Sequence, residues 1–110
     1  MTDDVGPQAR FEVLPGADGE SGATVRAAGD IDLTNVGEFQ AALERAAAES
    51  SAFTADMTAV TYCDSAAIRA LIIAARRGRL TIQVSRAGLI SETLLRVSGL
   101  DQIAAVVTLE

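Results

Sequence analysis

The sequence contains no histidine, no lysine and no tryptophan, and its only cysteine is Cys63. Without histidine, the chain has no imidazole for general acid–base catalysis, for a serine–histidine triad or for binding a metal ion. Without lysine, it can form neither a Schiff base nor the phosphate contact of a P-loop. A lone cysteine cannot form an internal disulfide or a metal site built from several thiolates. These absences predict a protein that is not an enzyme and that needs no cofactor or metal.

Long apolar runs and a leader-like start are also absent. No apolar stretch approaches the roughly 18 residues that a membrane-spanning helix needs. The first residues, Met1-Thr2-Asp3-Asp4, lack the basic and apolar regions of a signal peptide. We therefore expect a cytoplasmic protein that has no membrane partner.

Charge is present, but it is unevenly distributed. Residues 1–68 carry twelve acidic residues and three Arg, whereas residues 69–110 carry three acidic residues and six Arg, which gives a net charge of −6. Nucleic-acid-binding proteins gain much of their affinity by neutralising phosphates with basic groups, so this acidic chain is not expected to bind nucleic acid. The acidic N-terminal part instead suits a protein partner that carries a basic patch.

The spacing of apolar residues predicts one domain, residues 10–110, preceded by a flexible polar tail, residues 1–9. Two short segments with alternating apolar residues, near 11–13 and 25–27, are expected to pair as an antiparallel hairpin across the glycine-rich segment 15–22. Segments with apolar residues at helical spacing then alternate with further strand-like segments. We expect helices at about 35–50, 66–75 and 90–97, and strands at 53–57, 80–84 and 105–109.

Strands that are separated by helices imply mostly parallel pairing with right-handed crossovers. The predicted fold class is therefore α/β, with a mixed, mostly parallel β-sheet, an N-terminal antiparallel hairpin and helices packed against the sheet. Thr34 or Asn35 is expected to cap the first helix, with Glu38 completing a capping box. Arg76-Arg77-Gly78 is expected to stop the second helix, with the two cations at its negative end and the glycine in the C′ position. The apolar stripes predicted for the second and third helices consist of Ile68, Leu71, Ile72 and Ala75, and of Ile90, Leu94 and Val97.

The pair Asp64-Ser65 lies where a predicted strand gives way to a strongly apolar helix. In one interpretation, Asp64 is an ordinary N-cap whose carboxylate accepts free amides of the first turn. In the other, the exposed hydroxyl of Ser65 is a phosphorylation site, because a phosphate at that place meets free amides and the positive end of the helix dipole. Ser65 as a catalytic nucleophile is excluded, since the chain offers no histidine or lysine base.

Several segments together resemble STAS domains, which are named for sulphate transporters and anti-sigma factor antagonists. These segments are Gly29-Asp30-Ile31-Asp32 with the helix after it, Tyr62-Cys63-Asp64-Ser65, and Ser98-Gly99-Leu100. The resemblance covers the chain from about residue 10 to the C-terminus. The resemblance implies that the single-domain α/β fold predicted above is the STAS fold.

The resemblance implies roles for several residues. Ser65 matches the serine that is phosphorylated by the partner anti-sigma factor, which is itself a serine kinase, and Asp64 matches the acid before it. Asp30 and Asp32 match the turn beside the partner-binding surface. The expected partner-binding set is Asp30, Asp32, Asp64, Ser65, Ala66, Ala67 and Arg69.

The motif departs from the usual family pattern, which runs Asp-Ser-Ser/Thr-Gly. Here Asp64-Ser65 is followed by Ala66 and Ala67, so the second hydroxyl is absent and a Cβ stands where glycine allows closer backbone approach. Arg69 lies four residues after Ser65, on the same helix face, where it is either a phosphate contact or an ordinary solvated side chain. Cys63 is either a redox thiol or a small buried side chain, and the second reading is the commoner for a lone cysteine.

The resemblance implies a partner switch. The unphosphorylated chain would bind the anti-sigma factor and free a sigma factor, phosphorylation of Ser65 would end the binding, and a phosphatase would reset the chain. Two alternatives use the same domain: a STAS subunit of a membrane transporter for lipid or anion, which docks on its ATPase, and a scaffold subunit of a stress-sensing assembly.

Overall fold

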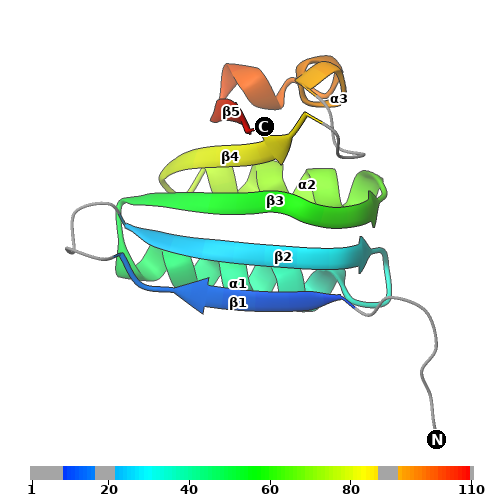
Figure 1. Cartoon of the computed structure of the whole chain (residues 1–110). Helices are drawn as coiled ribbons and strands as arrows, with labels where there is room; N and C mark the ends of the chain where they lie inside the picture. Colours follow the sequence, from blue (N-terminus) through cyan, green and yellow to red (C-terminus); the bar gives the residue numbers. More distant parts are fainter. Residues whose placement is uncertain (1–8, 17–21, 87–91, 110) are drawn as a thin grey trace, which may run out of the picture.

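Five strands form one mixed sheet in the spatial order β1-β2-β3-β4-β5 (Figure 1). β1 pairs antiparallel with β2, and the other neighbouring strands are parallel. The computed structural model describes residues 9–16, 22–86 and 92–109. The elements in chain order are β1 (Arg10–Leu14), β2 (Ala23–Ile31), α1 (Val36–Glu49), β3 (Ala52–Cys63), α2 (Ser65–Ala75), β4 (Arg79–Ser85), α3 (Glu92–Val97), the 3-10 helix η1 (Leu100–Gln102) and β5 (Ala105–Leu109).

This architecture confirms the predicted α/β class, the N-terminal hairpin and the order of strands and helices. The division into a tail, residues 1–9, and a domain, residues 10–110, stays a prediction, because residues 1–8 lie outside the described part of the chain. Each parallel pairing follows a helix, since the chain must return to the same edge of the sheet before it can run parallel to the previous strand.

The helices α1 and α2 cover one face of the sheet (Figure 1), and the core lies between these two layers. Strand residues that alternate along β2 and β4 point into it, as period-2 burial requires. The buried positions of α2 are Ala67, Ala70, Leu71 and Ala74. Of the predicted stripe on this helix only Leu71 is fully buried, and Ile68, Ile72 and Ala75 are partly buried beside it.

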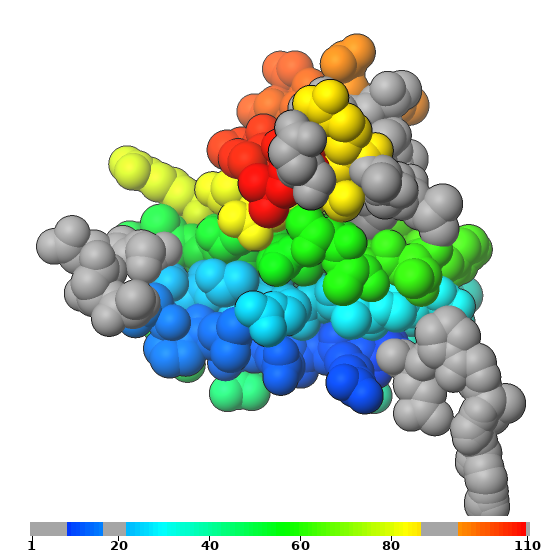
Figure 2. All heavy atoms as spheres, in the orientation of Figure 1, coloured from blue at the N-terminus to red at the C-terminus, as the bar shows by residue number. Residues whose placement is uncertain are grey.

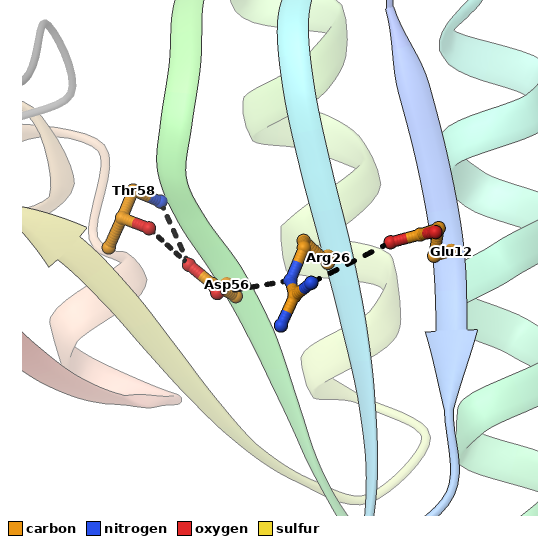
Figure 3. Close-up of polar contacts among 4 residues, drawn as sticks. All are labelled: Glu12, Arg26, Asp56 and Thr58. Carbon is orange, nitrogen blue, oxygen red and sulfur yellow. Dashed lines mark hydrogen bonds and ion pairs between the residues drawn. The ribbon is translucent and has the colours of Figure 1, made fainter.

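No helix of the described residues covers the opposite face of the sheet, which is viewed in Figure 2. A row of polar side chains crosses this face from β1 to β3 (Figure 3). Arg26 lies between Glu12, with its Nη1 3.8 Å from Oε1, and Asp56, with its Nε 3.9 Å from Oδ2. The Arg26–Glu12 pair is exposed, and such pairs contribute about 0–1 kcal/mol, whereas Asp56 is partly buried. Opposite charges on neighbouring strands favour this strand pairing, but they add little to the stability of the fold.

β3 is much longer than the expected segment 53–57, and it contains two β-bulges that the sequence did not reveal. Arg26 and Ala28 of β2 pair with Asp56 and Ala59 of β3, so β3 contains one residue more than β2 in this interval. β3 contains a second extra residue opposite the step from Gly29 to Asp30. The Asp56 carboxylate accepts the backbone N–H and the hydroxyl of Thr58, at 3.0 and 2.6 Å, within the first bulge. Each bulge shifts which residues face the core, from Phe53, Ala55 and Met57 to Val60 and then Cys63. Tyr62 consequently points outward at the end of the strand.

Two expectations about helix ends and stripes were wrong. Gly78 does not adopt the left-handed conformation, and it is needed instead for close approach, since a Cβ there would lie 2.7 Å from the Ser51 carbonyl oxygen. The left-handed glycine that follows a helix is Gly99, with φ 85°, after α3. In α3, Val97 is 81% exposed and Leu95 is buried, so Val97 is not the core position that the predicted stripe assigned to it. The side chain of Leu94 is not among those described. Ile90 lies outside the described residues.

Candidate functional site

The two segments that the sequence singled out meet at the carboxyl ends of β2 and β3. Asp30 pairs with Tyr62 and Ile31 with Cys63 in the parallel register. The backbone N–H of Asp64 donates to the carbonyl of Ile31 at 3.3 Å, which ties the start of α2 to the turn that follows β2. In open α/β sheets, sites lie outside the carboxyl ends of the strands. The predicted residues are therefore brought together where such folds place their sites.

The turn after β2 is held by the side chain of Asn35. Its Oδ1 accepts the backbone N–H of Asp32 at 3.0 Å, and its Nδ2 donates to the carbonyl of Asp30 at 2.9 Å. Asn35 occupies the N-cap position of α1 but makes no side-chain capping bond there. The predicted capping box with Glu38 was wrong, because the amide group of Asn35 is used to fix the acidic turn.

Asp32 and Thr34 form a tight local unit in this turn. The Asp32 carboxylate accepts the Thr34 hydroxyl at 2.5 Å and the Thr34 backbone N–H at 3.0 Å. Hydrogen bonds of this kind favour the charged form. The hydroxyl of Thr34 first, and its backbone N–H second, therefore lower the pKa of Asp32 below the ordinary value of 3.8. Asp32 stays ionised in the folded protein to a lower pH than in the unfolded chain.

We expect the Thr34→Val variant to raise the pKa of Asp32 toward its ordinary value, because valine removes the hydroxyl donor and keeps the backbone donor. Carboxyl-carbon NMR titration of both proteins measures the change. A lowered folded-state pKa stabilises the fold above the unfolded pKa, and this contribution is lost as pH falls through the folded pKa. The acid side of the stability profile should therefore be less steep in Thr34→Val. An unchanged Asp32 titration would contradict the assigned cause.

Asp30 is fixed across the strand pair. Its Oδ1 accepts the Thr61 hydroxyl at 2.5 Å. Next to Thr61, the ring of Tyr62 is 51% exposed. The bulges in β3 turn both side chains outward, so this corner combines a carboxylate with an accessible aromatic ring.

Asp64 caps α2, as one of the two interpretations predicted. Its Oδ1 accepts the backbone N–H of Ala66 at 2.9 Å, and its carbonyl accepts the N–H of Ala67 at 3.1 Å. Ser65 begins the helix and is exposed, and its hydroxyl makes no hydrogen bond within the described part of the chain. The cap thus presents a free hydroxyl at the first helical position. Capping by Asp64 and modification of Ser65 are structurally compatible.

A shallow groove of about 300 Å³ runs beside Ser65, between α1 and α2. One wall comes from the turn and from α1 and the other from α2; its lining includes Leu33, Val36, Gln40, Ser65, Arg69 and Ile73. Ala66 also faces the groove. Ala67, by contrast, is fully buried in the core, so it supports the site from below and presents no surface to a partner. Arg69 is exposed at the groove.

Cys63 is half-buried and packs against the core. Burial first, and the nearby charge of Asp64 second, raise the pKa of its thiol above 9.0. At neutral pH the group is therefore a protonated thiol, which is a poor nucleophile. This environment supports the reading of Cys63 as a small packing side chain.

Sequence reasoning missed Leu33, Val36, Gln40 and Ile73 as parts of the site. Leu33 is 78% exposed beside Ser65, which is an unusual position for a large apolar side chain. An apolar residue in the polar turn Asp32-Leu33-Thr34-Asn35 was the available signal. The others could not be found, because the groove exists only where two helices meet.

Two further features are absent from residues 9–16, 22–86 and 92–109. No group of three or more cysteine, aspartate or glutamate side chains is arranged to hold a metal ion in this part of the chain. None of its helices combines the length and apolar character required to cross a bilayer.

A family model described as "Mlab, STAS domain" matches residues 17–108. No curated protein sequence matches the chain at a significant level. The anti-sigma factor antagonist from Mycobacterium paratuberculosis is similar in structure, with a TM-score of 0.77 and 17% identity over 91% of this chain and 86% of that protein.

Two structures of SpoIIAA are similar as well. The anti-sigma factor antagonist SpoIIAA in its unphosphorylated form gives a TM-score of 0.65 and 14% identity, over 92% of this chain and 88% of that protein. The Bacillus cell fate determinant SpoIIAA in its phosphorylated form gives 0.64 and 16%, over 90% and 92%. At these identities the similarity establishes the shared fold.

Proposed function

The chain belongs to the STAS domain family, and from this membership we propose that it acts as an anti-sigma factor antagonist. In this function the unphosphorylated chain binds an anti-sigma factor and thereby frees a sigma factor for transcription. The chain works as a cytoplasmic binding module and not as an enzyme. The single observation that carries the proposal is the exposed hydroxyl of Ser65, which has no hydrogen-bond partner among the described residues and lies at the start of α2, between an acidic turn and a groove.

The partner is a serine-kinase anti-sigma factor that docks on the turn after β2 and on the start of α2. Asp30, Asp32 and Asp64 make this surface acidic, which suits a basic patch on the partner. The exposed Leu33 and the groove beside it supply an apolar centre, of the kind that carries most of the affinity in protein interfaces.

Phosphorylation of Ser65 ends the binding. The γ-phosphoryl group of ATP passes to the Ser65 hydroxyl oxygen, the bond to ADP breaks, and a base of the kinase takes the hydroxyl proton. ATP and Mg²⁺ are bound by the kinase, so this chain needs no cofactor. The phosphate adds about −1.5 to −2 charge beside Asp64, and repulsion and desolvation weaken docking. A serine phosphatase restores the hydroxyl.

A pull-down from cell extract tests this function, with the wild-type chain and the variants Ser65→Ala and Ser65→Asp as baits. We expect a serine-kinase anti-sigma factor with the wild-type chain and with Ser65→Ala, and little or none with Ser65→Asp. The same kinase recovered with all three baits would contradict a switch at Ser65.

Incubation of the chain with that kinase and ATP should place one phosphate on Ser65, because this hydroxyl is exposed and has no hydrogen-bond partner in the described part of the chain. Tandem mass spectrometry locates it, and Ser65→Ala is the control that should take up none. A phosphate on Ser50, Ser85 or Ser91 of the wild-type chain would overturn the assignment.

A second candidate function is docking on the ATPase of a membrane transporter for lipid or anion. Ala66 and Ala67 favour it, because they stand where the antagonist pattern carries a second hydroxyl residue and a glycine. Recovery of an ATPase instead of a kinase in the pull-down would decide for this function. If the mass of the protein measured in solution were that of a large assembly, this would favour a stress-sensing scaffold.

A further inference from the structure

Among the described residues, Arg69 is the only one with a charged side chain that lines the groove beside Ser65. Its guanidinium forms no ion pair or hydrogen bond with the described residues. Arg26 does form such pairs, with Glu12 and Asp56, and Arg77 pairs with Glu44 at 3.4 Å. The other exposed arginines without a partner among the described residues do not line this groove, so its place beside Ser65 is what distinguishes Arg69. Within the described part of the chain, Arg69 is therefore an unpaired cation at the edge of a groove whose other lining residues are uncharged.

Helix geometry directs Arg69 toward Ser65. Residues four apart on a helix lie on one face, with Cβ atoms about 5–6 Å apart. Side chains on a helix lean toward its N-terminus, so a long side chain covers the turn that precedes its own Cα. The turn that precedes Arg69 begins at Ser65, and both residues line the same groove.

We propose that Arg69 is shared between two anions in turn: a carboxylate of the docked partner when Ser65 is unmodified, and the phosphate of Ser65 after phosphorylation. The inference rests on the proposed function, and it adds an internal competition to the switch. In the unmodified chain, the guanidinium is the cation that an acidic partner side chain meets beside the apolar surface of Leu33 and Ile73.

The phosphate is the better ligand for Arg69 once it is present. A guanidinium binds phosphate oxygens through two parallel N–H donors and keeps its charge at every physiological pH. The phosphate is also attached one helical turn away, so it competes at a high effective concentration with a carboxylate of a second molecule. Phosphorylation then removes the docking cation and leaves a net negative charge in its place. Release follows from both changes.

The first test measures the contact between Arg69 and the phosphate of Ser65 in the absence of the partner protein. Phosphoserine is incorporated at position 65 during translation, and the second pKa of the phosphate is measured by ³¹P NMR titration in the parent chain and in Arg69→Met. We expect the phosphate pKa to rise by roughly 0.15–0.4 unit in Arg69→Met, because a nearby cation favours the dianion and an exposed pair one helical turn apart shifts the pKa by a fraction of a unit. Asp64 acts equally on both proteins, so its influence cancels in the comparison.

Arg45→Met is the matched control, since Arg45 is exposed on α1 and does not line the groove. It removes the same unit of charge at a distance, and the phosphate pKa should stay near that of the parent. Equal shifts in Arg69→Met and Arg45→Met would overturn the inference, whatever the affinities are.

The second test uses the kinase recovered with the wild-type chain and the unmodified proteins. Arg69→Met should bind it about tenfold more weakly than Arg45→Met does, as expected for the loss of a charged contact at an interface. An affinity equal to that of Arg45→Met, with the phosphorylation switch intact, would overturn the role of Arg69 and leave the proposed function standing. Failure of every form to bind a kinase would instead overturn the proposed function and the partner half of this inference.

Discussion

Ser65→Asp should weaken binding of the anti-sigma factor roughly 10- to 1000-fold, which corresponds to a loss of a few kcal/mol. At the interface the added carboxylate must be desolvated next to Asp64, which already carries a negative charge at the start of α2. The fold should remain intact, because a carboxylate near a helix N-terminus is tolerated and stabilises by about 0.3–1 kcal/mol. Calorimetric titration of the purified proteins measures the affinity, and thermal unfolding checks the fold.

Two variants control for this effect. Ser65→Ala should bind nearly as well as the wild-type chain, because it adds no charge, but ATP should no longer release it. Ser51→Asp adds the same charge at an exposed position before β3, at the other end of that strand, and should bind like the wild-type chain. Equal affinity for Ser65→Asp and Ser65→Ala would place Ser65 outside the interface.

Leu71→Ala should destabilise the fold by roughly 2–5 kcal/mol, because a buried leucine that is truncated loses its transfer free energy and leaves a cavity. Leu71 is fully buried on the face of α2 that packs against the sheet, and its buried neighbours on that helix are all alanines. Because alanine side chains have no rotamers, these neighbours cannot move into the space left by the truncated leucine. Urea denaturation monitored by circular dichroism gives the free energy of unfolding.

Leu33→Ala is the matched control for this prediction, because it makes the same chemical change at a side chain that is 78% exposed. Its free energy of unfolding should stay within about 0.5 kcal/mol of the wild-type value. Its binding to the anti-sigma factor should weaken, since Leu33 lines the groove. Equal losses of stability in the two variants would show that Leu71 is not part of the core.

The order of the elements was predictable from the sequence because segments with apolar residues at helical spacing alternate with strand-like segments, and the glycine-rich segment 15–22 separates the first two strands. The capping role of Asp64 was predictable for a similar reason, since it depends only on neighbouring residues. The fold and this part of the site are thus encoded locally.

The structure differs from expectation where tertiary contacts override a local pattern. The alternation of β3 stops near Met57, which predicted the end of a strand, whereas the strand continues to Cys63 through two extra residues. Asn35 is a good N-cap residue by type, but its amide is committed to the backbone of Asp30 and Asp32. Neither outcome follows from spacing, because each depends on a neighbouring strand or turn.

Release of a sigma factor tests the central claim most directly. A labelled sigma factor is bound to the recovered anti-sigma factor, and the unmodified chain or the chain with phosphoserine at position 65 is added while fluorescence anisotropy reports the bound fraction. We predict that the unmodified chain releases the sigma factor at a concentration at least about tenfold lower than the phosphoserine form requires. Equal release by both forms, or none by the unmodified chain, would contradict a partner switch at Ser65.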